Sequence, residues 1–364
     1  MKNCFIVFFT TTLVGSLIFS SCAPISPEAS PYPPSDRPVM ASMPDGPIEL
    51  KVATWGPAQL PISRVNQEWA DIIEERSGGK VKFTFYWAQS LVKAGDTWKA
   101  IQTGITDIGY FVLGFGGDPV LHALNGFTSL PFMGWEDMRM ATDIYHEIYP
   151  KFPELEAEFK GTKLLWSCNM PPDQIHSVNN EVRVPADYKG AKVIASGRLA
   201  QIAINAGAST ITMGPPDWYM SLERGLAESI MVHWPGIGGY NLVPLFNYHT
   251  DFGDAGISMS MHGMWINETV WNSLSAHIQK TILDNSTWIQ DRYISIDEAE
   301  IIRGINEAKE LEHTFSVLSP DEIEEWGKTA ESVTLEWIED VNAMGLPARA
   351  VYDETKRLIG EYKR

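Results

Sequence analysis

Aromatic and polar side chains stand at the predicted ends of strands, where an α/β protein opens its ligand cleft. The chain has 13 tryptophans. Their ring faces can hold an organic cation, at about 0.5 to 2 kcal/mol per contact, or stack on an aromatic ligand. The alternative for each such residue is structural, as a core tryptophan or a hydrogen-bonded histidine. The residues that we place in a cleft by position are Trp55, Trp87, Gln89, Tyr110, Phe111, Trp166, Trp218, His233 and Trp234.

The sequence lacks the short motifs that mark common catalytic sites. It has no Gly-x-Ser-x-Gly elbow, no His-Glu-x-x-His pair and no Walker-type phosphate loop. Its eight histidines show no metal-ligand spacing and no Cys-x-x-Cys pair is present, so we predict neither a metal nor a cofactor. We predict that the protein is not an enzyme. A secreted hydrolase stays open as an alternative, because a catalytic carboxylate pair forms only in three dimensions.

The composition indicates an acidic globular protein. Of 364 residues, 44% are hydrophobic, which rules out a disordered chain, and the length favours about two domains. The 28 Lys and Arg against 46 Asp and Glu give a net charge of −18. Phosphate backbones would repel such a chain, so a nucleic-acid partner is excluded. Cys168 stands alone in the body of the chain and is interpreted as a small buried hydrophobic residue.

The first residues are typical of an export signal. One positive charge at Lys2 precedes an apolar stretch, residues 5–19, that is shorter than the roughly 20 residues needed to span a bilayer. We predict a signal peptide at 1–21. The end of this stretch resembles a lipobox, with Ser20 and Ser21 before Cys22, so we predict a lipidated Cys22 and a periplasmic protein held to a membrane by its lipid. An ordinary cleaved signal is the alternative. Residues 22–47 are rich in Pro and Ser and predict an extended tether.

The body of the chain alternates strands and helices, which favours parallel sheets covered by helices. Apolar residues alternate with polar ones over 48–55 and 80–87, and they recur at helical spacing over 63–76, with Ser77-Gly78-Gly79 as a helix end. Further predicted strands span 106–112, 163–168 and 189–194, with helices at 95–104 and 198–206. Residues 269–314 read as one long helical stretch with almost no breakers, and 320–344 as two more helices.

Several short motifs follow one another in an order that resembles one transporter family. The motifs are Ser77-Gly78-Gly79-Lys80-Val81, Ala88-Gln89-Ser90-Leu91, Gly104-Ile105-Thr106-Asp107-Ile108, Tyr188-Lys189-Gly190-Ala191-Lys192-Val193, Asn205-Ala206-Gly207-Ala208-Ser209 and Met213-Gly214-Pro215-Pro216-Asp217-Trp218-Tyr219. In this order and spacing the chain resembles the DctP-type solute receptors of tripartite ATP-independent periplasmic (TRAP) transporters, from about Ile48 to the C-terminus. A receptor of another importer class stays open as an alternative.

The resemblance implies an α/β fold of two lobes, with parallel or mixed sheets, joined by crossing strands and a long helix. A small organic solute would be held between the lobes and delivered to membrane permease subunits that use an ion gradient. The lobe boundaries that we expect are 48–170 with 258–295 for lobe I, and 171–257 with 296–364 for lobe II. The family counterpart of the helix at Asp217 and Trp218 borders the solute.

The resemblance also implies a changed ligand site. Family members hold a substrate carboxylate with an arginine that ends the strand after the Lys-Gly motif, and its planar fork pairs bidentately with carboxylate. Ile194 stands there in this chain, with Arg198 four residues on as a possible replacement. Asp173 falls where many members carry a second arginine. The resulting ligand options are a small amine bound by Asp173 and aromatic faces, an aromatic acid stacked on tryptophan, and a simple carboxylate.

Overall fold

The computed structural model describes residues 46–113 and 122–362. The predicted signal peptide (1–21), Cys22 and nearly all of the predicted tether (22–47) lie outside the described residues. Within the described ranges, no helix combines the length and the apolar composition needed to cross a bilayer. The body from Asp45 to the C-terminus forms one compact unit that contains two sheets.

The first sheet has five strands in the order β2-β1-β3-β10-β4. Strand β1 (Ile48–Thr54) lies between β2 (Val81–Tyr86) and β3 (Ile108–Val112) and is parallel to both. Strand β10 (Met261–Asn267) is antiparallel to β3 and to β4 (Thr162–Asn169). The carboxyl ends of β1, β2, β3 and β4 therefore share one edge of the sheet, which is where the sequence places the cleft residues.

The second sheet has six strands in the order β11-β9-β5-β8-β6-β7. These strands are β5 (Asp173–Ser177), β6 (Lys192–Ile194), β7 (Ser209–Ile211), β8 (Ser229–His233), β9 (Tyr248–Asp251) and β11 (Thr314–Val317). Strand β5 is antiparallel to both of its neighbours, with Asp173 opposite His233. Because β6 and β8 are parallel, the start of β5 and the ends of β6 and β8 lie at one edge.

Two connections cross side by side between the sheets. Met170–Pro172 joins β4 to β5, and residues 252–260 join β9 to β10. The Met170 amide donates to the Ser260 carbonyl at 2.7 Å, and the Asp173 amide donates to the Ser258 carbonyl at 2.9 Å. These crossing segments and a long helix link two lobes, as predicted, and the fold class is confirmed as a mixed α/β structure. The lobe boundaries stay a prediction.

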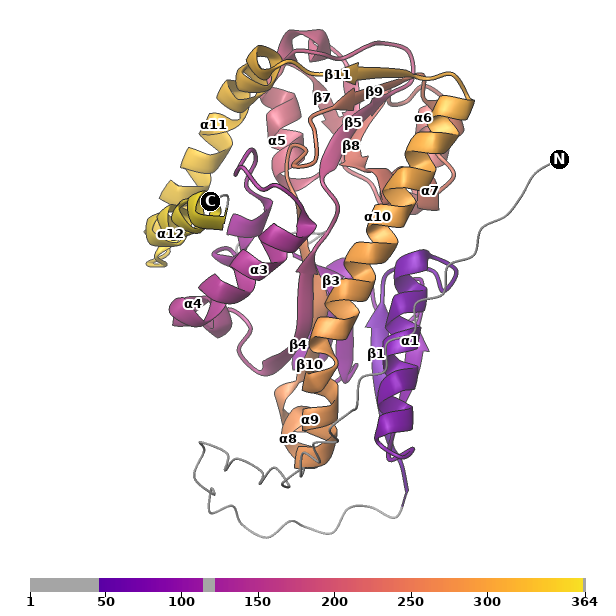
Figure 1. Cartoon of the computed structure of the whole chain (residues 1–364), viewed down its shortest axis with the longest axis vertical. Helices are drawn as coiled ribbons and strands as arrows, with labels where there is room; N and C mark the ends of the chain where they lie inside the picture. Colours follow the sequence, from indigo (N-terminus) through magenta and orange to yellow (C-terminus); the bar gives the residue numbers. More distant parts are fainter. Residues whose placement is uncertain (1–45, 114–121, 363–364) are drawn as a thin grey trace, which may run out of the picture. The chain divides into compact units, whose positions relative to one another are not determined.

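The stretch 269–314 is not one helix, and that part of the prediction was wrong. It contains α8 (Glu268–Ser273), α9 (Ala276–Asp284) and α10 (Ser286–Glu310). The Ser275 hydroxyl accepts from the Ile278 amide at 3.3 Å and starts α9, and the side-chain amide of Asn285 donates to the Thr281 carbonyl at 2.6 Å. Such polar side chains compete with backbone hydrogen bonds and favour helix ends. Helix α10, 25 residues long, contacts β4 and α1 (Pro61–Arg76) near the first sheet and α7 (Trp234–Gly239) near the second (Figure 1).

The remaining helices cover the sheets. They are α1 (Pro61–Arg76), α2 (Thr97–Gln102), α3 (Met138–Ile148), α4 (Pro153–Ala157), α5 (Gly197–Asn205), α6 (Trp218–Glu223), α7 (Trp234–Gly239), α11 (Pro320–Ala343) and α12 (Ala348–Tyr362). Short 3-10 turns are η1 (Ala94–Asp96), η2 (Asn125–Ser129), η3 (Tyr149–Lys151), η4 (Pro185–Tyr188), η5 (Pro215–Asp217) and η6 (Val243–Leu245). The two helices predicted over 320–344 are a single one, α11, which starts at a Ser319–Glu322 capping box.

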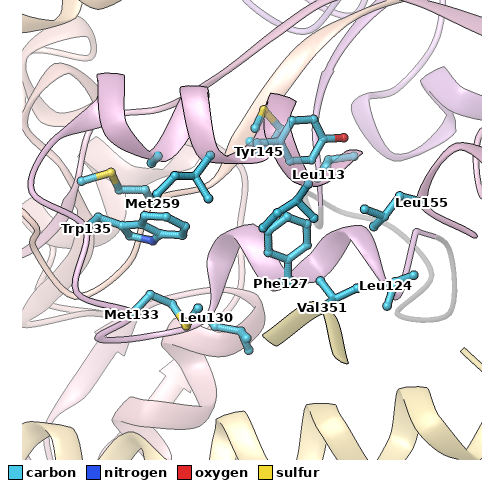
Figure 2. Packing of buried hydrophobic residues seen from close by; sticks show 14 of the residues in the cluster. Leu113, Leu124, Phe127, Leu130, Met133, Trp135, Tyr145, Leu155, Met259 and Val351 are labelled. Atoms are coloured by element: carbon cyan, nitrogen blue, oxygen red, sulfur yellow. The ribbon is translucent and has the colours of Figure 1, made fainter. Parts of the chain in front are cut away.

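A large core cluster ties the C-terminal helices to the first sheet. The rings of Phe127 and Tyr145 stack with centroids 5.9 Å apart, and Figure 2 shows them beside Leu113. Val351 of α12 belongs to the same cluster. Helix α12 contacts α3, whereas α11 contacts α5 of the other half. The last two helices therefore bind both halves of the molecule.

Candidate ligand-binding site

A cavity of about 40 Å³ lies where the loop after β1 meets the start of α7 and the middle of α10. Its polar and aromatic lining comes from Trp55, His233, Tyr240, His262, Asp297 and Glu300. Its apolar lining comes from Leu60, Pro61, Ile62, Met170 and Pro235. The space suits a few water molecules. A solute of several heavy atoms therefore requires the walls to move apart.

His233 presents a neutral imidazole to this cavity. It ends β8 and caps α7, where its Nδ1 accepts a hydrogen bond from the Gly236 amide at 3.0 Å. Burial lowers the His233 pKa to about 4, so the ring is uncharged at neutral pH. Because Nδ1 is an acceptor, the ring proton lies on Nε2. His233 can therefore offer one neutral donor to a ligand.

Aromatic rings of the first sheet stand behind the cavity wall. Trp55 stacks on Tyr110 with centroids 6.1 Å apart, and Tyr110 stacks on Trp166 at 5.9 Å. The Tyr110 hydroxyl is 2.6 Å from Nδ1 of His262, whose Nε2 lies 2.9 Å from Sγ of Cys168. Both nitrogens of His262 are thus engaged. Tyr110 and Trp166 are almost fully buried, so they support the Trp55 ring rather than meet a solute directly in this state.

Asp297 is a buried acid that lines the cavity and that the sequence did not predict as a site residue. It lies on α10 with 3% of its surface exposed. Within the described residues its carboxyl group makes no hydrogen bond and no ion pair. Burial raises its pKa to about 8, and the charges of Glu300 and Glu298 add to this effect. A partner for this group is missing from the part of the chain that the structure describes.

A helical period could have located Asp297. The buried residues Ile289, Tyr293, Asp297, Gly304 and Ala308 recur at three- to four-residue steps or multiples of them along α10. The adjacent Glu298-Ala299-Glu300 run masks this period, because neighbouring acidic residues are typical of a solvated helix face. His262 and Tyr240 carried no comparable signal, because β10 and the end of α7 were not predicted in detail.

Among the residues that the structure describes, no lysine or arginine lines the cavity. Glu300, at its edge, is 2.6 Å from a guanidinium nitrogen of Arg303, so its charge is paired. Asp297 has no such pairing within the described chain. Tyr240 closes the cavity beside α7, and its ring meets Trp218 edge-on at 5.8 Å. Acidic, aromatic and apolar groups therefore surround one small space.

Asp173 lies close to the cavity without lining it. It is the cross-strand neighbour of His233, and its Oδ2 accepts from the Ser258 hydroxyl at 3.0 Å. Burial raises its pKa to about 7. Ile194 is 3% exposed and packs in a core cluster with Trp218 and Trp234. Its side chain in this structure belongs to that core.

Arg198 lies apart from the cavity, between the two halves. Its Nη1 donates to the Ser129 hydroxyl of η2 at 2.5 Å, and its guanidinium is 6.0 Å from the ring centroid of Trp337 on α11. Burial lowers its pKa to about 10. Within the described residues it forms no ion pair. Arg198 is therefore a cation with no counter-charge from the described chain, next to both halves of the molecule.

Two predicted residues follow β2 and do not line the cavity. Trp87 stacks on Phe85 with centroids 4.4 Å apart. Gln89 uses its Oε1 to accept from the Ala94 amide at 3.1 Å and lines a separate groove of about 560 Å³ with Lys93 and Lys99. Neither residue joins Trp55 and His233 in the cavity.

The last predicted residues pack within the lobes. Phe111 faces away from the cavity and stacks on Trp265 at 4.4 Å. Trp218 begins α6 after Asp217 and donates its indole N–H to the Met213 carbonyl at 3.1 Å. Trp234 packs edge-on against His176 at 4.8 Å. Of the predicted cleft residues, the structure brings Trp55 and His233 together in one cavity, with Asp173 beside it.

The fold and the chain's sequence match a known family. A model of the bacterial extracellular solute-binding protein family 7, of the DctP type, matches residues 52–340. The chain belongs to this family. The resemblance to TRAP solute receptors is thereby confirmed, and the protein is a solute receptor rather than an enzyme.

Solved structures show the same fold. A TRAP solute-binding protein of a marine metagenome, specific for aromatic acids and solved with 3-hydroxybenzoate, is similar with a TM-score of 0.80 and 21% identity, covering 88% of this chain and 100% of that one. A receptor of Bordetella bronchiseptica with bound mandelate gives 0.77 and 19%, covering 87% and 100%. A receptor of Rhodoferax ferrireducens with benzoate gives 0.76 and 20%, covering 87% and 98%.

Proposed function

We propose that this TRAP receptor binds a small organic cation, such as an amine or amino-alcohol, in the cavity at Trp55, His233 and Asp297. One observation carries the proposal: within the described chain, the cavity contains a buried carboxyl group without a partner, and no lysine or arginine. A carboxylate out of water is strongly destabilised unless it is paired. An ammonium group would supply the missing charge.

The other walls fit the rest of such a solute. Trp55 and Tyr240 offer ring faces, which attract a cation by about 0.5 to 2 kcal/mol each. Leu60, Ile62 and Met170 offer apolar surface for its carbon atoms. His233 can donate to a hydroxyl group of an amino-alcohol. These contacts together favour a cation with a small apolar body.

The carboxylate ligands of the similar structures do not match the chemistry of this cavity. Those proteins hold benzoate, 3-hydroxybenzoate or mandelate. In this chain, Ile194 and Asp173 stand where the family pattern carries arginines, and Asp297 would repel a carboxylate. The acidic lining therefore supports a different solute class within the same fold.

Binding would stabilise a closed arrangement of the two lobes. The cavity of about 40 Å³ is too small for a solute to enter without movement. A solute that contacts Trp55 of one lobe and His233 of the other favours closure by its higher affinity for the closed state. The closed receptor would then deliver its cargo to the membrane permease subunits.

An aromatic carboxylate is the second candidate, and Arg198 is the observation that favours it. Its guanidinium has no carboxylate partner in the described chain and lies beside the Trp337 ring. An aromatic acid could pair with Arg198 and stack on that indole. This site would differ in place from the cavity at Asp297.

A thermal-shift screen separates the two candidates. A ligand at 100 times its dissociation constant adds about 2.7 kcal/mol to the stability of the protein. Choline, ethanolamine and tyramine are tested against benzoate, mandelate and indole acetate. We expect the cations to raise the melting temperature of the wild type and of the control Glu310→Gln, which removes an exposed acid at the end of α10. We expect Asp297→Asn to reduce cation affinity at least tenfold. Stabilisation by acids alone, lost in Arg198→Ala, would overturn the cation proposal.

We also propose that Cys22 carries a lipid that holds the exported receptor at a membrane. The Ser20-Ser21-Cys22 sequence after an apolar run supports this proposal. Mass spectrometry of the mature N-terminus tests it, because a lipidated protein starts at a diacylated cysteine. A mature chain that starts at an unmodified residue would contradict it.

A further inference from the structure

We propose that the solute's cationic group displaces the proton of the Asp297 carboxyl group, so that one proton leaves the protein for each solute bound. This proposal rests on the proposed function and adds a regulation to the same site. It predicts that solute affinity responds to external pH through one residue. The step balances, because R-NH3+ and the neutral COOH group give an R-NH3+···−OOC pair and one H+ released to water.

Among the described residues around Asp297, no cation is available to neutralise an ionised Asp297 carboxylate. The groups that face it or lie within electrostatic range come from α10, β3, β4, β10, the end of β8 and the end of α7. They are Glu298, Glu300, Tyr293, Tyr110, Tyr240, Cys168, His262 and His233. The acids are negative, and the tyrosines, the thiol and the two histidines are neutral when buried. Arg303, the nearby guanidinium, is paired with Glu300 at 2.6 Å.

Before a solute binds, the cavity therefore favours the protonated acid. At 3% exposure, water cannot solvate an ionised Asp297 well. Its pKa of about 8 places a proton on it at neutral pH. A solute cation reverses this balance, because an opposite charge within about 4 to 6 Å favours the ionised form and lowers the pKa again. The proton then leaves as the ion pair forms.

The same geometry predicts how affinity changes with pH. Below pH 8 each solute must remove a proton, so affinity rises about tenfold for each unit of pH increase. Above pH 8 the acid is already ionised and affinity levels off. Burial lowers the pKa of His233 to about 4 and that of His262 to about 3, so neither ring changes charge between pH 6 and 8.

Titration calorimetry on the mature receptor tests this coupling. Choline is the first probe, since its charge is fixed and any pH dependence belongs to the protein, and ethanolamine is the second. Heats measured at pH 6.5 in phosphate and in imidazole buffer, which differ in ionisation enthalpy, count the protons exchanged. We expect about one proton released per solute, and about tenfold tighter binding at pH 7 than at pH 6.

Two variants test whether the proton that is released on solute binding comes from Asp297. Asp297→Asn is expected to bind weakly, with no proton release and no pH dependence, whereas Glu310→Gln, which removes an exposed acid at the far end of the same helix, is expected to match the wild type. Cation binding without proton release by the wild type would overturn the coupling and leave the proposed function standing. If neither cation produces a binding heat at any pH between 6 and 9, both proposals fail. The wild-type proton count does not depend on whether a variant folds.

Discussion

Replacing Asp297 with Asn should change how the stability of the solute-free protein depends on pH. Burial raises the Asp297 pKa from 3.8 to about 8, so the folded state holds this proton more tightly than the unfolded state does. A group with a raised folded pKa contributes its full stability below the unfolded pKa, near 4, and that contribution is lost as the pH rises through about 8. Asparagine does not ionise, so the stability of the Asp297→Asn variant does not fall with rising pH through this position.

The size of the effect follows from the proton balance. Between pH 5 and 7 the unfolded chain has lost the proton and the folded chain keeps it, so wild-type stability falls by about 1.4 kcal/mol per pH unit through this group. The free energy of unfolding of Asp297→Asn, relative to wild type, should therefore increase by about 3 kcal/mol over these two units. Asp173, whose pKa is also raised by burial, acts equally in both proteins and cancels.

Urea unfolding at pH 5, 6 and 7 measures this difference. Glu310→Gln is the matched control, since it removes an exposed acid from the far end of the same helix α10, and its difference from wild type should stay constant. A constant difference for Asp297→Asn as well would refute the reasoning. In that case the carboxyl group must be ionised and paired in the folded protein, and the site at α10 would need another explanation.

Two further substitutions test the placement of predicted residues. Ile194→Arg, which places an arginine where the resemblance leads us to expect one in the family, should destabilise the protein by about 3 to 5 kcal/mol, because it buries a charge in an apolar cluster. Urea unfolding measures this, and a stable variant that gains benzoate affinity would show that position 194 faces the cleft. Gly126→Ala would place a Cβ 2.7 Å from Nη2 of Arg198. The guanidinium would have to shift away from Ser129, which should cost about 0.5 to 1.5 kcal/mol through the weakened hydrogen bond. Combining it with Arg198→Ala should remove most of that cost in a double-mutant cycle, and unchanged additivity would mean that the two do not touch.

Local patterns in the sequence were sufficient to predict the fold class. The alternating residues 48–54 form β1, and the helix over 63–76 is present as α1 with its end at Ser77. Such segments are predictable because side-chain periodicity and end signals act over a few residues. The ordered motifs from Ser77 to Tyr219 likewise indicated the family, because each motif is a short stretch of neighbouring residues. Where competing side-chain bonds decide, as at Ser275 and Asn285, the prediction of one long helix was wrong.

The candidate site depended on contacts between residues far apart in the chain. Asp173 is predicted to contact the solute, and its carboxyl group accepts a hydrogen bond from Ser258, 85 positions later. Arg198 meets Ser129 from a distance of 69 positions. No local pattern encodes such pairs.

The sequence by itself determined an acidic α/β solute receptor, because composition, periodicity and motif order are local properties of the chain. Only the tertiary structure decided which acid is buried in the cavity that we propose as the solute site. Asp297 and the neighbouring Glu298 are similar residues in sequence, and the packing of α10 between the two halves buries one and exposes the other. That difference in solvation gives the two carboxyl groups different chemistry.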